Sequence, residues 1–168
     1  MKIKFKENKP FFENISIEDI TNQINTPFYL YSQKEIENTY KTIKNHLNAE
    51  IFYAVKANSN QAILKILKNC GAGADVVSVG ELERALNAGF NPSKIIFEGV
   101  GKSQDDIKYA IKQKIRLLNV ESLNEIELIN KIAKDLNEII NIGIRLNPDI
   151  DVYSLAKIST GKKTDKFG

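Results

Sequence analysis

The chain has 168 residues, 27% of them charged, and a formal net charge of +3, which is ordinary for a globular protein with one hydrophobic core. Its lysines are scattered among glutamates and asparagines, which argues against a nucleic-acid-binding stripe, and no apolar stretch approaches the roughly 20 residues of a membrane span or forms a signal-peptide core. The single cysteine, Cys70, excludes an intrachain disulfide, so the cytoplasm is the default location.

Short apolar runs recur along the chain, and each is closed by polar residues or glycine. In chain order, the expected strands lie within residues 27–32, 51–58, 73–78, 94–99, 115–122 and 141–149. A segment with helical periodicity lies between successive runs. Strands that alternate with helices of this length indicate βαβ units and a parallel sheet, so the expected fold class is α/β.

The expected helices have recognisable ends. They cover residues 33–47, 61–69 and 81–87, and two more begin after Ser103 and Ser122. A serine followed three residues later by an acidic residue has the spacing of a capping box, and it occurs at Ser32–Glu35, Ser103–Asp106 and Ser122–Glu125. Gly71 suits a left-handed C-terminal cap.

Polar residues collect at the carboxyl ends of the expected strands. They are Lys56, Asn58, Asp75, Ser78, Glu98, Asn119, Glu121, Arg145 and Asn147. In a (β/α)8 barrel this face carries the active site, and a doubly wound open sheet also binds ligands at strand carboxyl ends. The pattern alone therefore leaves both architectures open.

Lys56 lies within the run 51–58, at the end of its apolar part, which has the composition of a strand buried on both faces. An ammonium group on such a strand is costly unless it is paired or neutralised. Burial in general lowers the pKa of a lysine amine, and a free amine can condense with a carbonyl to form a Schiff base. The alternative is a lysine that merely caps the strand and reaches water.

Other familiar chemistries fit the chain poorly. The only histidine, His46, lies on a helix end rich in lysine and asparagine, and Cys70 has no nearby histidine, so Ser-His-Asp and Cys-His mechanisms are not supported. The sequence contains no HxH, HExxH or CxxC motif, so a metal site is not expected. The Gly99–Ser103 loop ends in Gly-Lys-Ser, but Ile96 replaces the first glycine of a P-loop.

Several motifs, taken together, resemble those of the fold-type III pyridoxal-phosphate decarboxylases. In the order of that family they are Thr26–Tyr31, Tyr53–Asn58, Ala74–Leu82, Gly99–Ser103, Asn119–Ser122, Arg145–Asp149, Ile158–Gly161 and Lys166–Gly168. The last two favour the diaminopimelate branch over ornithine or arginine decarboxylases. Departures from the family pattern occur at Val79, Val100 and Leu155, and the last of these replaces a common histidine on the substrate side.

The resemblance implies a (β/α)8 TIM barrel of the alanine racemase-like type and pyridoxal 5'-phosphate as the cofactor. It implies that Lys56 holds this cofactor through a Schiff base, and that Asp75 and Arg145 line the cofactor cavity. The alternative for Asp75 and Arg145 is a structural ion pair at the barrel mouth. The implied reaction is the decarboxylation of meso-diaminopimelate to L-lysine, in lysine biosynthesis.

The resemblance also implies a domain organisation. Residues 1–25 would lead into the barrel, and residues 26–168 would form the first part of the cofactor-binding barrel domain. Because an eight-stranded barrel needs roughly 250 residues, we expect an incomplete barrel that lacks the family's C-terminal β domain, and we expect these 168 residues alone to be inactive. The full-length enzyme is expected to be a cytoplasmic homodimer with a small-molecule amino-acid substrate and no nucleic-acid or membrane partner.

Two alternative functions remain open at this level. One is another fold-type III pyridoxal-phosphate enzyme, such as an ornithine or arginine decarboxylase or an amino-acid racemase. The other is an inactive fragment that binds the cofactor or a partner without catalysis.

Overall fold

The computed structural model describes residues 3–150. The chain divides into two compact units between Leu47 and Asn48. The expectations that concern Leu155 and the motifs at 158–161 and 166–168 lie outside the described residues.

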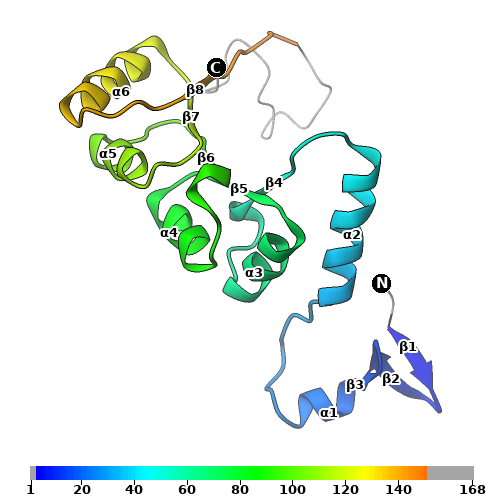
Figure 1. The fold of residues 1–168 in the computed structure, drawn as a ribbon. Helices are drawn as coiled ribbons and strands as arrows, with labels where there is room; N and C mark the ends of the chain where they lie inside the picture. Colours follow the sequence, from blue (N-terminus) through cyan, green and yellow to red (C-terminus); the bar gives the residue numbers. More distant parts are fainter. Residues whose placement is uncertain (1–2, 151–168) are drawn as a thin grey trace. The chain divides into compact units, whose positions relative to one another are not determined.

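The first unit begins with a three-stranded antiparallel sheet in the order β1-β2-β3 (Figure 1). Its strands are β1 (Lys4–Lys6), β2 (Lys9–Phe12) and β3 (Ile15–Ser16). Glu7 and Asn8 join the first two strands with φ of 50° and 62°, the conformation of a two-residue hairpin turn. The helices α1 (Ile17–Thr21) and α2 (Gln33–His46) follow. The expected helix at 33–47 is thereby confirmed, and the Ser32 hydroxyl accepts a hydrogen bond from the Glu35 amide at 3.1 Å.

The expected strand at 27–32 is wrong. These residues form neither a helix nor a strand. Tyr29 and Tyr31 are 88% and 56% exposed, and their rings stack on each other with centroids 6.4 Å apart. A strand requires a neighbouring strand to complete its ladder of hydrogen bonds, and the apolar composition of a run does not supply that neighbour.

The second unit contains a five-stranded sheet in which all neighbouring strands are parallel. Its strands are β4 (Phe52–Ala54), β5 (Gly73–Val76), β6 (Ile95–Phe97), β7 (Leu117–Val120) and β8 (Ile142–Ile144). Each lies within an expected run, so the α/β fold class is confirmed. The spatial order β4-β5-β6-β7-β8 follows the chain order, as in a (β/α) barrel, whereas a doubly wound sheet reverses its order part-way.

Four helices alternate with these strands and lie along one side of them (Figure 1). They are α3 (Gln61–Cys70), α4 (Val79–Asn87), α5 (Gln104–Lys112) and α6 (Leu123–Asp135). Gly71 ends α3 with φ of 97°, and Ser103 forms a complete capping box with Asp106. Within residues 3–150, no helix combines the length and the apolar character that a membrane span requires.

The two faces of the parallel sheet differ in burial. The side chains on the helix-covered face are almost completely buried, and they include Ala74, Val76, Ile95, Phe97, Leu118 and Val120. The alternate residues, among them Asp75, Ile96 and Asn119, are half-buried on the opposite face. Complete burial of a large apolar side chain contributes about 1.5–3 kcal/mol, so the helix-covered face is the main source of stability in this unit.

Strand β4 is not buried on both faces, contrary to the expectation. Phe52, Tyr53 and Ala54 are all half-buried, and Val55 is the first fully buried residue of the run. The reason is that, among the described strands, β4 pairs only with β5 and so forms an edge of the sheet. Lys56 lies beyond the strand, in the 3₁₀ turn Val55–Ala57.

Gly73 provides a test of this packing, because a Cβ atom there would lie 2.4 Å from Phe52 Cδ1 and 2.7 Å from the Lys94 carbonyl oxygen. We expect Gly73→Ala to lower the free energy of unfolding by about 2 kcal/mol, because the Lys94 backbone cannot yield as a side chain can. The measurement is urea unfolding of the full-length protein. Gly80→Ala is the matched control, since the nearest atom to a Cβ at this helical position is 3.9 Å away and alanine favours helix. Equal losses in the two variants would contradict the packing.

Candidate functional site

The turn that follows β4 holds Lys56 at the carboxyl end of the parallel sheet. The Tyr53 hydroxyl donates to the Asn58 carbonyl oxygen at 3.3 Å, and the Asn58 side chain accepts from the Asn60 amide at 3.0 Å. Asn60 in turn caps α3 through the Ala62 amide at 2.9 Å. These bonds fix the backbone on the C-terminal side of Lys56, while its own side chain is exposed.

The exposure of Lys56 changes the argument for its reactivity. A buried strand was expected to force the amine into its neutral form, but the side chain instead reaches solvent. The position of Lys56 agrees with the alternative given by the sequence, in which the lysine caps the strand and its side chain reaches water. An amine that condenses with an aldehyde must also be accessible, so this placement is compatible with a Schiff-base role.

Asp75 is the most perturbed carboxyl group near Lys56. In the sheet register it pairs with Ala54 on one side and Ile96 on the other, so its lateral neighbours are apolar. Its Oδ1 atom is buried and has no hydrogen-bond partner among the described residues. Burial, and then the charge of Glu98, raise the pKa of Asp75 to about 6, while the positive charge of Lys56 acts in the opposite direction.

A polar hollow of about 300 Å³ lies at the carboxyl ends of β6, β7 and β8. Its lining residues are Glu98, Asn119, Glu121, Ile144 and Arg145. The Asn119 side-chain amide donates to Glu98 Oε1 at 2.7 Å. Arg145 Nη1 lies 3.4 Å from Glu121 Oε1, and the Glu121 side chain is only 5% exposed. We call these five residues the polar pocket.

Gly143 makes room for Asn119 in this pocket. The two residues are register partners on β8 and β7, and a Cβ atom at position 143 would lie 2.1 Å from Asn119 Oδ1. Any larger residue at 143 would force the Asn119 side chain to rotate. The hydrogen bond between Asn119 and Glu98 therefore depends on a glycine in the neighbouring strand.

The three residues expected to form the site are brought together only in part. Lys56 and Asp75 interact electrostatically at the ends of the adjacent strands β4 and β5. Arg145 follows β8, which is separated from β5 by two strands and thus by roughly 14 Å across the sheet. A structural ion pair does exist at this face, but it joins Arg145 to Glu121, and Asp75 forms none among the residues described.

Sequence reasoning placed Glu98, Asn119 and Glu121 at the strand ends but gave them no role. The available signal was the spacing of these residues. Asn119 on β7 and Glu121 just after it are two positions apart, and alternate residues share one face of a strand, while Glu98 directly follows β6. The sequence does not reveal which of these side chains pair with each other, because the register between strands decides that.

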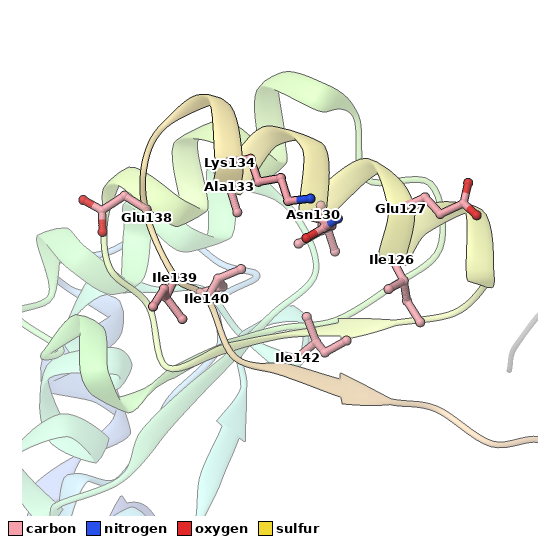
Figure 2. A pocket seen from close by; sticks show the side chains of 10 residues that line it. Ile126, Glu127, Asn130, Ala133, Lys134, Glu138, Ile139, Ile140 and Ile142 are labelled. Carbon is pink, nitrogen blue, oxygen red and sulfur yellow. The ribbon is translucent and has the colours of Figure 1, made fainter.

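A second, larger hollow of about 460 Å³ lies between α6 and β8 (Figure 2). In Figure 2, Ile126 points from the helix toward the strand, and Ile142 points from the strand toward the helix. Its charged residues, such as Glu127 and Lys134, belong to the helix and to the loop that follows it. This hollow lies on the helix-covered side of the sheet, whereas Lys56, Asp75 and the polar pocket lie on the opposite face or at the carboxyl ends of the strands.

Comparison with known proteins assigns the family. The family model described as pyridoxal-dependent decarboxylase, pyridoxal binding domain, matches residues 33–168. The chain belongs to this family. The assignment identifies the barrel architecture and names pyridoxal phosphate as the cofactor bound by this kind of domain.

Individual relatives narrow the comparison. The chain is 44% identical over 160 residues to diaminopimelate decarboxylase from Vibrio cholerae, and this match covers 93% of the chain and 38% of the relative. It is 47% identical over 154 residues to diaminopimelate decarboxylase from Helicobacter pylori, with coverage of 90% and 38%. The crystal structure of the Helicobacter pylori enzyme complexed with L-lysine superposes with a TM-score of 0.86 at 44% identity, covering 90% of this chain and 39% of that one. The chain thus spans about two fifths of the length of these relatives.

The residues at the sheet ends fit pyridoxal phosphate. The cofactor carries an aldehyde, and Lys56 presents an accessible amine at the end of β4. It also carries polar ring substituents, and Asp75 offers a buried oxygen with no partner among the described residues. Within residues 3–150, no group of three or more His, Cys, Asp or Glu side chains is arranged to hold a metal ion.

The raised pKa of Asp75 predicts a pH-dependent cost in stability. Because the folded-state pKa of about 6 lies above the usual 3.8, the folded state binds the proton more tightly, and stability falls as the pH rises from about 4 to 6. Asp75→Asn removes this titration. Between pH 4 and pH 7.5, we expect the free energy of unfolding of the variant, relative to that of the wild type, to increase by roughly 1–2 kcal/mol. This is less than the full pKa shift implies, because the carboxyl group is only half-buried and solvent screens its charge.

The measurement is urea unfolding of the cofactor-free, full-length protein at both pH values. Asp105→Asn serves as the control, because Asp105 is exposed on α5. A stability difference between Asp75→Asn and wild type that does not change with pH would show that the Asp75 carboxyl group titrates normally.

Proposed function

We propose that the full-length protein is a pyridoxal-phosphate-dependent decarboxylase that converts meso-diaminopimelate to L-lysine and carbon dioxide. The observation that carries the proposal is the accessible Lys56 amine and its electrostatic interaction with the half-buried carboxyl group of Asp75, in a pyridoxal-binding domain. The identity of 44–47% to diaminopimelate decarboxylases supports the choice of substrate. The net reaction breaks the bond between a carboxylate and its α-carbon, releases carbon dioxide and places a proton on that carbon.

In this proposal Lys56 is the residue whose amine would hold the cofactor. When bound, pyridoxal phosphate supplies the electron sink for the electrons left behind by carbon dioxide. Lys56 is suited to its task because its side chain is exposed while the surrounding backbone is tied by Asn58 and Asn60.

Asp75 holds or releases a proton beside the amine of Lys56. A carboxyl group whose pKa lies near 6 can exchange a proton close to neutral pH, which an ordinary aspartate does poorly. The same carboxyl group, when charged, attracts the ammonium group of Lys56. Asp75 therefore links the protonation of the site to the position of the lysine.

Arg145 and its neighbours supply the polar wall on the other side of the site. Glu121 orients Arg145, and Asn119 orients Glu98. A guanidinium group held by a nearly buried carboxylate keeps a defined direction, and it can hydrogen-bond an anionic group of the cofactor or substrate. We assign Arg145 to cofactor binding on this basis.

The family resemblance supports further features of the full-length enzyme. We propose a cytoplasmic homodimer with a small-molecule amino-acid substrate, and no nucleic-acid or membrane partner. We also propose that residues 26–168 belong to the cofactor-binding barrel domain and that residues 1–25 lead into it.

A second candidate is decarboxylation of another basic amino acid. The lysine/ornithine decarboxylase from Vibrio vulnificus superposes with a TM-score of 0.71 at 25% identity, and the matched family covers pyridoxal-dependent decarboxylases in general. An arginine decarboxylase of a Chlorella virus, at 22% identity, shares the fold. The lower identities make this candidate weaker than the first.

The role of Lys56 is tested by its replacement. In the full-length protein we expect Lys56→Ala to lose the visible absorption of lysine-bound cofactor and to reduce turnover by at least roughly 1,000-fold, because no other group replaces the lost amine. Lys65→Ala is the matched control, since Lys65 is an exposed lysine on α3. Spectra and carbon dioxide release are measured on both variants. Full absorption and turnover in Lys56→Ala would remove this residue from the site.

Substrate choice separates the two candidate reactions. We expect kcat/KM for meso-diaminopimelate to exceed that for ornithine or lysine by at least roughly 100-fold, because a site built for a second amino-acid head group leaves polar groups unpaired with a simpler chain. The measurement is carbon dioxide release from each substrate at equal enzyme concentration. Comparable or faster turnover of ornithine would favour the second candidate.

A further inference from the structure

Lys102 is a buried lysine whose hydrogen-bond donors are all used. Its side chain is 1% exposed. The ammonium group donates to the carbonyl oxygens of Gly99 and Asn119, each at 2.7 Å, and to Glu125 Oε1 at 2.8 Å. A lysine ammonium has three donors, so none is left for a ligand phosphate. The Gly-Lys-Ser sequence here is therefore not a phosphate-binding loop.

The glycines of this loop serve the turn that brings Lys102 inward. Gly99 and Gly101 adopt φ of 102° and 80°, a region that other residues rarely occupy. Ser103 then starts α5 with its capping box. The loop thus leaves β6, turns twice and places the Lys102 ammonium group 5.9 Å from the centre of the Phe97 ring.

The partners of Lys102 come from three different parts of the fold. Gly99 belongs to the loop after β6, Asn119 lies on β7, and Glu125 lies in the first turn of α6. The second oxygen of Glu125 accepts a hydrogen bond from the Glu121 amide at 2.8 Å. One buried ammonium group therefore connects the backbone at the ends of two neighbouring strands. It bonds directly to the carbonyl groups of Gly99 and Asn119, and it is linked to the Glu121 amide through the Glu125 carboxylate.

The residues tied in this way carry the side chains of the polar pocket. Glu98 directly precedes Gly99, and its carboxylate accepts from the Asn119 side chain. Glu121 pairs with Arg145. A shift of these backbone segments would change the distances within both pairs.

We propose that Lys102 is a positioning residue for the polar pocket. It touches neither cofactor nor substrate, and it fixes the backbone from which Glu98, Asn119 and Glu121 project. The consequences for cofactor and substrate rest on the proposed function, whereas the effect on the backbone does not. If Lys102 only stabilised the fold, its replacement would leave the polar pocket unchanged as soon as a second substitution restored the stability.

A double variant separates these two roles. Lys102→Met leaves Glu125 without its ionic partner, and we expect the unfolding midpoint to fall by roughly 10 °C. In Lys102→Met/Glu125→Gln neither residue of the buried Lys102–Glu125 pair carries a charge, and the glutamine oxygen can still accept from the Glu121 amide. We expect its midpoint to recover to within about 5 °C of the wild type, because the uncompensated charge of Glu125 is removed while the Gly99 and Asn119 carbonyl oxygens still lack the lysine donor. Lys108→Met, which replaces an exposed lysine of α5, is the control.

Two readouts are taken on the double variant of the full-length protein. In the cofactor-free protein, hydrogen exchange of the amides in residues 117–126 should be at least roughly 10-fold faster than in the wild type. With cofactor added, the dissociation constant for pyridoxal phosphate should rise roughly 10-fold, and kcat should fall more than KM rises.

A double variant that matches the wild type in amide exchange and in cofactor affinity would overturn the proposal. A double variant as unstable as Lys102→Met would also overturn it, because Lys102 would then be required by the fold itself. If the wild type bound no pyridoxal phosphate, the proposed function would fail, and the exchange comparison would still decide the role of Lys102.

Discussion

The parallel register of β4 to β8 is the constraint on which the rest of the site depends. It aligns Ala54, Asp75, Ile96 and Leu117 in one row across the face opposite the helices. The next row toward the carboxyl ends contains the register partners Asn119 and Gly143, and the Asn119 side chain donates a hydrogen bond to Glu98. In the row after that, Glu121 forms an ion pair with Arg145. The side chains on this face therefore change from mostly apolar to polar toward the carboxyl ends, and the polar pocket lies where the change is complete.

Asp75 is the exception in this gradient, because it lies in an otherwise apolar row. Its position explains why burial is the largest cause of its raised pKa and why one of its oxygens has no partner among the described residues. An unpaired buried acceptor costs about 1–3 kcal/mol, so the sheet would be more stable with an apolar residue there. Destabilising polar groups at strand ends are typical of binding sites, and the Lys56 amine lies at the end of the adjacent strand, where the Asp75 carboxyl group can exchange a proton with it.

The parts of the fold that depend on local sequence could be predicted. Helix starts at Ser32, Ser103 and Ser122 follow from a serine and an acidic residue three positions later, and the structure confirms them. The same signal at Ser78 and Glu81 places the start of α4 two residues before the expected one. The two Glu-Asn pairs at 7–8 and 13–14 were the visible signal for the hairpins of β1 to β3, which sequence reasoning missed.

The parts that depend on partners distant in sequence could not be predicted. Residues 27–32 have a strand-like composition but pair with none of the strands described within residues 3–150, and β4 is only half-buried because it lies at an edge of the described sheet. For the site, the sequence indicated which polar residues follow the strands but not their pairing. The sequence argued against a phosphate-binding loop at Lys102 but did not reveal the bonds of Lys102 to Asn119 and Glu125, which are 17 and 23 residues away.

The assignment of Lys56 as the point of cofactor attachment is tested most directly by chemical trapping. The full-length protein would be loaded with pyridoxal phosphate, reduced with borohydride, digested and mapped by mass spectrometry. We predict a single major modified peptide, with the phosphopyridoxyl group on Lys56. Modification of a different lysine, or no stable modification under saturating cofactor, would contradict the assignment of the site to the carboxyl end of β4.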